Sequence, residues 1–539
     1  MNVPDPVSNS MNSAPRSNRS PAGLGAWNLY FLAKFALFWK ELIGFHPIEN
    51  FAFALVLLVP LESPTWRRVR HAMAVPAGIA LLYYDTWLPS LGRVLSQVNL
   101  ISNFSLAYLI ELGGRFVSVP VVALLAGVCA AYLILSRWLR FSVVVTGALL
   151  LLAAGGTPQG PYTATDSANA GSVAAGAAKT DPETALREFF AREAGRAVAM
   201  PKPAPGDAPF DVIFLHVCSL SWDDLQAAGL ENHPLLPRFD FLLTRFNSAS
   251  TYSGPAAIRI QRATCGQAAH DKLYAPAAAN CYLMESMREA GFEPAVVLNH
   301  DGQFDNFLKF IQAQGGMQVP PMPLGGIRVA QHSFDGSPIY DDAGVLGQWL
   351  GTRAKAKPER MAVYYNTISL HDGNRLSGDK AQTGSLETYR ARLAKLLDDL
   401  DGFLLALEKS GRRAVVVMIP EHGAAVRGDR MQIAGLREIP SPAITLVPVG
   451  IKVIGPQAHR NGNAARIDEA TSYLAVSELV ARMLARTPFS AAGFSPAEYS
   501  AEVPSTPFVA QGEDAVVIQS GGSYLLRQGG AGWGNYRLE

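Results

Sequence analysis

The chain has 539 residues, which is enough for more than one domain with its own core. Its 46 Lys and Arg residues and 45 Asp and Glu residues leave a formal charge of +1, which excludes the strongly basic character of many nucleic-acid-binding proteins. Four cysteines are too few for a disulfide-rich secreted scaffold. Long apolar runs gather in the first part of the chain, so the composition predicts a membrane domain followed by a soluble domain.

Residues 1–24 are polar, rich in Ser, Asn and Pro, and carry Arg16 and Arg19. This composition predicts a disordered cytoplasmic tail. A cleaved signal peptide is not expected, because a long polar segment precedes the first apolar run and further apolar runs follow it.

Residues 25–156 are predicted to form an α-helical membrane domain with about five spans. The stretch VSVPVVALLAGVCAAYLILS has no charged residue over the length that crosses a bilayer. Lys34 in the first stretch and the shortness of the second leave four spans as the alternative. The five apolar stretches cover about 26–44, 48–63, 71–89, 117–136 and 140–155.

Positive charges in the connecting loops favour five spans. Arg67, Arg68 and Arg70 lie between the second and third stretches, and Arg137 and Arg140 lie between the fourth and fifth. The positive-inside rule places these loops in the cytoplasm. The N-terminus is then inside and the chain after the fifth stretch is outside, in the periplasm if the cell is a Gram-negative bacterium.

Residues 157–208 have the composition of a linker, with many small and polar residues. Within them, DPETALREFFAREAGRA predicts a short helix that starts at Asp181 and Pro182. Residues 209–539 are predicted to form a soluble domain outside the membrane, which is the periplasm in a Gram-negative bacterium.

In residues 209–539, predicted strands and predicted helices alternate along the chain. The alternation favours a mostly parallel sheet with helices on both faces. A β-hairpin predicted over 514–528 turns at Gly521 and Gly522. Strands are expected over 211–218, 294–300, 361–371, 414–422 and 442–453, and helices over 279–290, 384–409 and 471–486.

Four of these strands end in residues that bind metals or carry protons. Cys218, His300 and His371 end three of them, and Glu421 with His422 ends the fourth. Because parallel strands present their carboxyl ends at one edge, these side chains are expected to lie close together. A Cys, a Glu and a His can serve as the three protein ligands of a catalytic zinc site. Cys218 also has the interpretation of a small buried hydrophobe, and the residues alone leave both readings open.

The segment NSASTYSGPAAIRIQRATCG (247–266) places Ser253 at the start of a helix-like run. Gly254 and Pro255 follow, and proline suits the first turn of a helix. The N–H groups of a helix N-terminus favour a phosphate, and a zinc-bound serine there would attack phosphorus. The alternative is an ordinary serine cap, which is far commoner than a nucleophile.

Four segments together resemble the BcsG-type cellulose phosphoethanolamine transferases of the alkaline-phosphatase/sulfatase-like superfamily. The resemblance covers nearly the whole chain. It implies an N-terminal multi-span α-helical membrane domain and a C-terminal α/β alkaline-phosphatase-like domain with a mostly parallel sheet. The segments are HVCSLSWDDL (216–225), TYSGPAAIRIQRATCG (251–266), NTISLHDGNR (366–375) and PEHGAAVRGDRMQIAGLREIPSP (420–442).

Matching position by position, the resemblance gives three residues catalytic roles. Ser253 looks like the nucleophile, His371 looks like the general acid/base, and Tyr252 looks like their substrate-side neighbour. The zinc ligands that it implies are Cys218, Glu421 and His422, with Ser253 as the metal-binding residue in the fourth position.

The resemblance also implies residues around this centre. Arg437 looks like a substrate-binding residue, and Cys265 and Cys281 look like the family's disulfide. His300 and Arg427 are added as substrate-binding candidates from their position and charge alone.

The implied reaction has two steps. Ser253 takes phosphoethanolamine from phosphatidylethanolamine, and a glucosyl 6-hydroxyl of cellulose then accepts it. The implied cofactor is Zn²⁺, and the implied partners are the membrane and subunits of the cellulose synthase complex, with no nucleic acid. The expected location is the bacterial inner membrane, with the catalytic domain in the periplasm.

Two alternatives remain open at this point. One is a phosphodiesterase or other hydrolase of the same superfamily, since only the acceptor differs. A sulfatase is disfavoured because SGPAAIR lacks the C/S-x-P-x-R spacing. The other is a non-catalytic membrane scaffold of the cellulose secretion complex.

Overall fold

The computed structural model describes residues 23–40, 42–86, 104–115, 119–154, 181–303, 306–529 and 532–536. These residues divide into two compact units. The first takes its described residues from Met1–Trp87 and Val119–Gly160, and the second from Leu88–Ser118 and Pro161–Glu539. Almost all of the predicted tail and about half of the predicted linker lie outside the described residues.

The described part of the first unit consists of helices around a small apolar core. Phe31, Phe45 and Leu149 are buried in this core. Pro47 and Pro64 stand in first turns, where a helix does not need the N–H that proline lacks. The helices are α1 (Trp27–Trp39), α2 (Pro47–Leu58), α3 (Pro64–Tyr84), α7 (Val119–Leu135) and α8 (Phe141–Ala154).

Lys34, the charged residue of the first apolar stretch, is buried in this unit. Its Nζ donates to Asn50 Oδ1 at 2.6 Å and forms an ion pair with Asp85. Asp85 also accepts from the ring of His46 at 2.6 Å. A carboxylate at the end of α3 therefore neutralises the lysine, which explains how an otherwise apolar helix accommodates it.

Helix length does not establish the predicted membrane spans. In the described part of the chain, no single helix is both long and apolar enough to cross a membrane. Leu106–Arg115 and Val119–Leu135 meet the length and composition criteria only when they are counted together. The multi-span domain therefore stays a prediction.

A seven-stranded sheet, in the order β10-β2-β9-β8-β1-β6-β3, lies at the centre of the second unit. Four neighbouring pairs are parallel, and the two pairs that involve β9 are antiparallel. The sheet is therefore mixed, with the expected parallel character in most pairs. The strands are β1 (Asp211–Val217), β2 (Phe241–Asn247), β3 (Glu293–Leu298), β6 (Met361–Thr367), β8 (Ala414–Pro420), β9 (Leu446–Ile454) and β10 (Ala465–Ile467).

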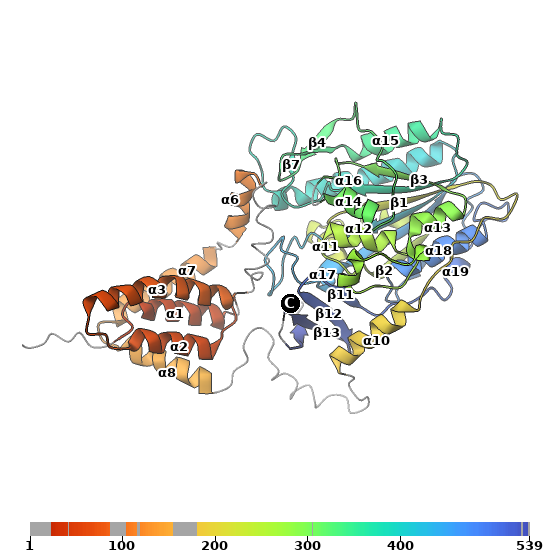
Figure 1. Ribbon diagram of the computed structural model, residues 1–539. Coiled ribbons are helices and arrows are strands. Elements are labelled where there is room, and N and C mark those ends of the chain that lie inside the picture. The colour runs from red at the N-terminus through yellow and green to blue at the C-terminus, as the bar shows by residue number, and fades with distance from the viewer. Residues whose placement is uncertain are drawn as a thin grey trace, which may run out of the picture. The chain divides into compact units, whose positions relative to one another are not determined.

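Successive residues of the central strands alternate between two apolar cores, so both faces of the sheet are buried. On β1, Val212 and Phe214 belong to one core, and Ile213 and Leu215 belong to the other. Helices cover both faces (Figure 1). The first core is covered by α12 (Ser253–Gln261), α13 (Leu283–Glu289), α14 (Phe307–Ala313), α18 (Tyr473–Ala485) and α19 (Pro496–Ser500). The second is covered by α11 (Trp222–Ala228), α15 (Asp342–Arg353) and α16 (Ser385–Lys409).

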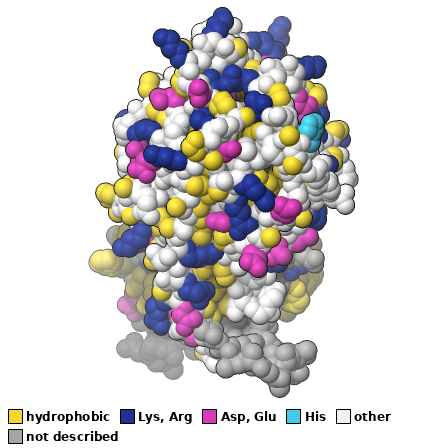
Figure 2. Space-filling model, turned by 90° about the vertical axis from the view of Figure 1, so that its right-hand side faces the viewer, with side chains coloured by type: hydrophobic (Ala, Val, Ile, Leu, Met, Phe, Trp, Pro, Cys, Tyr) yellow, Lys and Arg dark blue, Asp and Glu magenta, His cyan; other side chains and the backbone are white. Residues whose placement is uncertain are grey.

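The surface charge agrees with the balanced composition. Over the face that Figure 2 presents, Lys and Arg side chains are interspersed with Asp and Glu.

The main differences from expectation concern two strands. The segment predicted as a strand over 442–453 begins with one helical turn, α17 (Pro442–Thr445), and β9 then runs antiparallel. Pro442 at the first helical position favours this turn. β2 was not expected, because Thr244 and Arg245 interrupt its apolar pattern on the solvent side.

Two smaller sheets complete the second unit. The hairpin predicted over 514–528 is confirmed, with Gly521 and Gly522 at positive φ in its turn. Helix α10 (Pro182–Ala194), capped by Asp181, packs Phe189 against this hairpin. The sheets contain β11 (Val509–Gln511), β12 (Ala515–Ser520), β13 (Ser523–Gln528) and β14 (Gly534–Tyr536), and β4 (Val329–His332), β5 (Pro338–Tyr340) and β7 (Arg375–Leu376). Short 3₁₀ turns cover Leu236–Arg238, His270–Tyr274 and Ala279–Cys281.

Candidate functional site

Two neighbouring parallel strands bring three expected residues together at their carboxyl ends. Cys218 directly follows β1, and Glu421 and His422 directly follow β8. The backbone N–H of Glu421 donates to the carbonyl of Val217 at 2.8 Å, so the strands stay paired where these side chains leave the sheet. The three side chains are buried, and one candidate ligand atom from each lies within 4.8 Å of the others.

The residues of this cluster fit a metal ion. Nδ1 of His422 lies 2.9 Å from the carbonyl oxygen of Gly423 and 3.3 Å from Nη1 of Arg437. The shorter contact favours a proton on Nδ1, which makes Nε2 the acceptor nitrogen of the ring. Among the described residues, neither this Nε2 nor Oε2 of Glu421 has a hydrogen-bond partner. Unpartnered buried acceptors are costly, and a cation between them would remove that cost. Thiolate, carboxylate and imidazole together suit zinc.

Burial favours the uncharged form of each side chain in this cluster. It raises the pKa of the Cys218 thiol to about 12, and the Glu421 carboxylate adds to the rise. Burial likewise raises the pKa of Glu421 and lowers the pKa of His422, to which Arg437 also contributes. A bound divalent cation would favour the thiolate and the carboxylate instead.

Ser253 approaches the same cluster from the start of α12. Its Oγ lies 3.4 Å from Sγ of Cys218. The N-cap of the helix is Tyr252, whose side chain makes no capping hydrogen bond, and Ser253 is the first helical residue. The serine therefore does not serve as an N-cap, and its hydroxyl points toward the candidate ligands.

Arg437 is the cation beside this centre. Its Nη1 donates to Ser219 Oγ at 3.1 Å, and its guanidinium lies 5.4 Å from the ring centre of Tyr252. The Tyr252 hydroxyl donates to Glu438 at 2.5 Å. Ser219 has a φ of 63°, a left-handed conformation that turns the chain immediately after Cys218.

His371 lies just beyond the end of β6. Its Nδ1–H donates to the carbonyl of Asp372 at 2.7 Å, so Nε2 is the basic nitrogen of the neutral ring. Burial lowers the pKa of His371 to about 4, and Arg437 adds to this effect. The ring is therefore neutral at pH 7 and can accept a proton.

Helix α6 (Leu106–Arg115), which belongs to the second unit, holds the residue after His371. Arg115 donates to both carboxylate oxygens of Asp372 at 2.7 Å, and Tyr108 donates to Oδ2 at 3.0 Å. Glu111 of the same helix forms an ion pair with Arg375. The helix thus anchors the loop that carries His371.

His300 connects to the cluster through a neighbour. Its Nε2–H donates to Asn366 Oδ1 at 2.9 Å, and Nδ1 accepts from the backbone of Gly302. Asn366 in turn donates to Glu421 Oε1 at 2.6 Å. The structure therefore places His300 behind a candidate ligand, where it orients Asn366.

Arg427 is not brought to the cluster. Its side chain is 53% exposed and forms an ion pair with Asp223 of α11. No contact between Arg427 and the three candidate ligands is present among the described residues.

Sequence reasoning missed the support of the loop after His422. Asp224 accepts from the backbone N–H of Ala424 at 2.7 Å and of Val426 at 3.2 Å. A Cβ on Gly423 would lie 2.6 Å from Ser221 Oγ, so this close packing needs glycine. The Ser221-x-x-Asp224 capping box signals a helix start, but it does not reveal the second partner of Asp224.

The fold and the site define an α/β protein with a candidate metal site at the carboxyl edge of its sheet and a serine that faces this site. Comparison with known proteins assigns the family. The chain belongs to the BcsG family: residues 166–533 match the cellulose biosynthesis protein BcsG C-terminal domain, and residues 27–154 match the BcsG N-terminal domain.

Two curated proteins show the same relationship over almost the whole chain. Cellulose biosynthesis protein BcsG of Escherichia coli K12 is 42% identical over 542 residues, covering 95% of this chain and 96% of that protein. Its counterpart in Salmonella typhimurium LT2 is 40% identical with the same coverage.

Solved structures give a weaker likeness. A protein in the alkaline phosphatase superfamily from Vibrio parahaemolyticus has a TM-score of 0.47 and 14% identity, covering 67% of this chain and 90% of its own. Because this TM-score is below 0.5, the family assignment rests on the sequence matches.

Proposed function

We propose that the chain is a zinc-dependent transferase that moves phosphoethanolamine from phosphatidylethanolamine to glucosyl 6-hydroxyls of cellulose. The observation that carries this proposal is the position of Ser253 Oγ, 3.4 Å from Cys218 Sγ in a buried cluster with two unpartnered acceptors. The name of the BcsG family supports a place in cellulose biosynthesis.

In the first half-reaction, Ser253 Oγ forms a bond to phosphorus while the bond from phosphorus to the glycerol oxygen breaks. Diacylglycerol leaves after that oxygen takes up a proton. In the second half-reaction, a glucosyl 6-oxygen attacks phosphorus, the Ser253 oxygen leaves, and the serine hydroxyl is restored. One nucleophile serving two substrates in turn predicts ping-pong kinetics.

The residues of the centre divide this work. Cys218, Glu421 and His422 would hold zinc, which supplies a Lewis acid that activates the serine hydroxyl. His371 carries the proton between the attacking and leaving oxygens. Arg437 stabilises negative charge on the phosphoryl oxygens.

The exposed apolar side chains support a membrane location for the first unit. Val119 is 81% exposed and Leu151 is 75% exposed, and many other large apolar side chains of this unit are exposed too. In the described part of 181–536, the exposed large apolar residues are Tyr274 and Leu405. Apolar surface of this extent suits lipid better than water.

The contact of α6 with the loop that carries His371 supports the proposed topology. Leu106–Arg115 pairs with the His371 loop, so both must lie on the same side of a membrane. The chain between Arg115 and Asp181 must then cross an even number of times, as α7 and α8 would. The proposed place is the inner membrane, with the catalytic domain in the periplasm beside the cellulose synthase complex.

The decisive experiment is intact mass measurement of the full-length protein in lipid nanodiscs containing phosphatidylethanolamine, without an acceptor. A phosphoethanolamine adduct is expected on the wild type and on Ser523→Ala, an exposed control on β13. Ser253→Ala and chelator-treated protein should carry none.

The outcomes separate the alternative functions. Donor consumption without an adduct, unchanged by added glucan, would favour a hydrolase. Cellulose modification that survives Ser253→Ala would overturn the enzyme proposal and favour a scaffold.

A further inference from the structure

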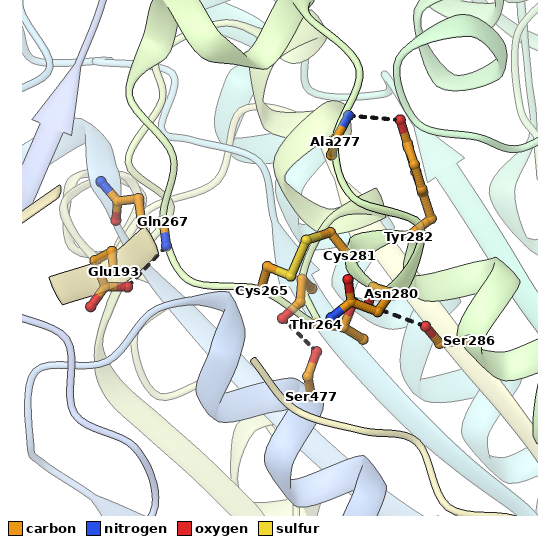
Figure 3. Close-up of a disulfide and its surroundings, with 11 residues drawn as sticks. Glu193, Thr264, Cys265, Gln267, Ala277, Asn280, Cys281, Tyr282, Ser286 and Ser477 are labelled. Carbon is orange, nitrogen blue, oxygen red and sulfur yellow. Dashed lines mark hydrogen bonds between the residues drawn. A yellow bond between two sulfur atoms is a disulfide. The ribbon is translucent and has the colours of Figure 1, made fainter. Parts of the chain in front are cut away.

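The second unit contains a pocket of about 430 Å³ that includes none of the proposed catalytic residues. The disulfide between Cys265 and Cys281 forms part of its wall. Figure 3 shows this disulfide between the contact of Glu193 with Gln267 and the contact of Ala277 with Tyr282. The size of the pocket lies in the range of small-molecule sites.

Arg259 of α12 lines this pocket and is only 4% exposed. Its Nε donates to Ser250 Oγ and its Nη1 to the carbonyl of Ala268, both at 2.9 Å. Its Nη2 has no hydrogen-bond partner among the described residues, and no carboxylate there forms an ion pair with it. A buried cation in this state is costly unless an anion joins it.

Tyr473, the first residue of α18, supplies a second unpartnered donor to the same pocket. It is 5% exposed, and in the described structure its hydroxyl lacks a hydrogen-bond partner. The acidic residue of the lining, Glu193, is already engaged by Arg196 at 2.6 Å and by the backbone of Gln267 at 2.9 Å. Gln267 also lines the pocket, and its Oε1 is a buried acceptor without a partner in the described structure. The pocket therefore offers two buried donors and one neutral acceptor. Its acidic side chain, Glu193, is already paired, so the charge of Arg259 still lacks an anion.

Much of the remaining lining is apolar. Phe190, Leu273 and Leu474 contribute side chains, and Ala194 and Ala277 leave room between them. A ligand that fills this space needs an anionic end and a compact apolar end.

We propose that this pocket binds a small organic anion. A carboxylate or phosphate group accepts hydrogen bonds from Arg259 and Tyr473, and a short apolar group packs against Phe190, Leu273 and Leu474. The site is separate from the reaction centre, yet Arg259 holds Ser250, three residues before Ser253.

The test is calorimetric titration of the full-length, zinc-loaded protein with butanoate, butyl phosphate, inorganic phosphate and neutral butanamide. Butanoate or butyl phosphate is expected to bind, and butanamide is not. Tyr473→Phe should weaken binding several-fold without loss of folding, because it removes a hydroxyl that has no partner.

A matched pair of variants locates the binding site. Ala277→Leu fills the pocket and should reduce affinity at least roughly tenfold, since the apolar group loses its place. Ala278→Leu is the control, because this neighbour is exposed and does not line the pocket.

Equal affinity in the two leucine variants would place the anion elsewhere, for example at the reaction centre, and would overturn the proposal. Absence of binding by both organic anions would also overturn it. Inorganic phosphate that binds as tightly as butyl phosphate would contradict the role of the apolar lining. The proposal is supported if Ala277→Leu loses binding while Ala278→Leu keeps it. The anion whose binding is lost, butanoate or butyl phosphate, is then the one that the pocket accepts.

Discussion

Cys218 is the residue on which the metal assignment depends most, because its thiol is buried and its pKa is raised. Replacing Cys218 with alanine removes one of the three proposed zinc ligands, so zinc content should fall well below one equivalent and the proposed transfer should be lost. The matched control is Cys129→Ala, which alters the other free cysteine, in α7. Metal analysis of the purified proteins checks this, and full zinc occupancy in Cys218→Ala would remove the residue from the ligand set.

Some residues of the candidate site could be predicted from the sequence, and others could not. Cys218, Glu421 and His422 could be predicted because each directly follows a strong strand pattern. The roles of Asp224 and Arg115 could not be predicted, because their hydrogen-bond partners lie 200 and 257 positions away in the sequence. A local sequence pattern does not indicate contacts over such separations. Arg427 was predicted to lie at the site and does not. Its position in the sequence near the candidate ligands does not reveal which way its side chain points.

At the scale of elements, α6 should control the placement of His371. Replacing Arg115 with alanine removes both hydrogen bonds to Asp372 and loosens the loop. We expect kcat to fall roughly tenfold while KM for the proposed lipid donor changes little, because misplacing His371, the proposed proton carrier, slows the chemical step. Amide hydrogen exchange over residues 370–376 should quicken in the same variant.

Arg115→Lys serves as the control for this clamp. Lysine keeps the positive charge but cannot donate to both carboxylate oxygens of Asp372 as the guanidinium does. The kcat of Arg115→Lys should therefore lie between those of Arg115→Ala and the wild type. Wild-type turnover and wild-type exchange in Arg115→Ala would show that α6 does not position His371.

The disulfide between Cys265 and Cys281 should stabilise the second unit. It closes a loop with a sequence separation of 16, and such a loop contributes about 3 kcal/mol to the free energy of unfolding. Cys265→Ser with Cys281→Ser should therefore unfold at lower denaturant concentration than Cys129→Ser. The same midpoint for the double variant and its control would contradict a stabilising role.

Helices and strands could be predicted where the local pattern of apolar and polar residues determines the secondary structure. β8 is a continuous apolar run, and β1 is apolar except for Asp211 and His216, so the burial of both strands follows from their sequences. The antiparallel direction of β9 could not be predicted, because direction depends on which edge the chain reaches after the helical turn at Pro442. The docking of α6 could not be predicted either, because its partners Asp372 and Arg375 lie more than 250 positions away in the sequence.

At the scale of the whole molecule, buried titrating groups act on stability in opposite directions. Burial raises the pKa of Asp224 to about 6, so on acidification the folded state takes up its proton first and gains stability. Burial lowers the pKa of His371 to about 4, so there the unfolded state takes up its proton first. The total pH profile mixes these effects, and a difference between variants separates them.

The contribution of His371 can be isolated by comparing the wild type with His371→Asn. Between pH 6.5 and 4 the unfolded state binds a proton at His371 that the folded state does not, so wild-type stability falls as the pH falls. The wild type should lose up to about 3 kcal/mol more than the variant across this range. Denaturant unfolding of the metal-free proteins at several pH values measures it. Parallel profiles would mean that His371 is not held neutral in the folded protein, and its proposed role as a proton acceptor at neutral pH would lose this support.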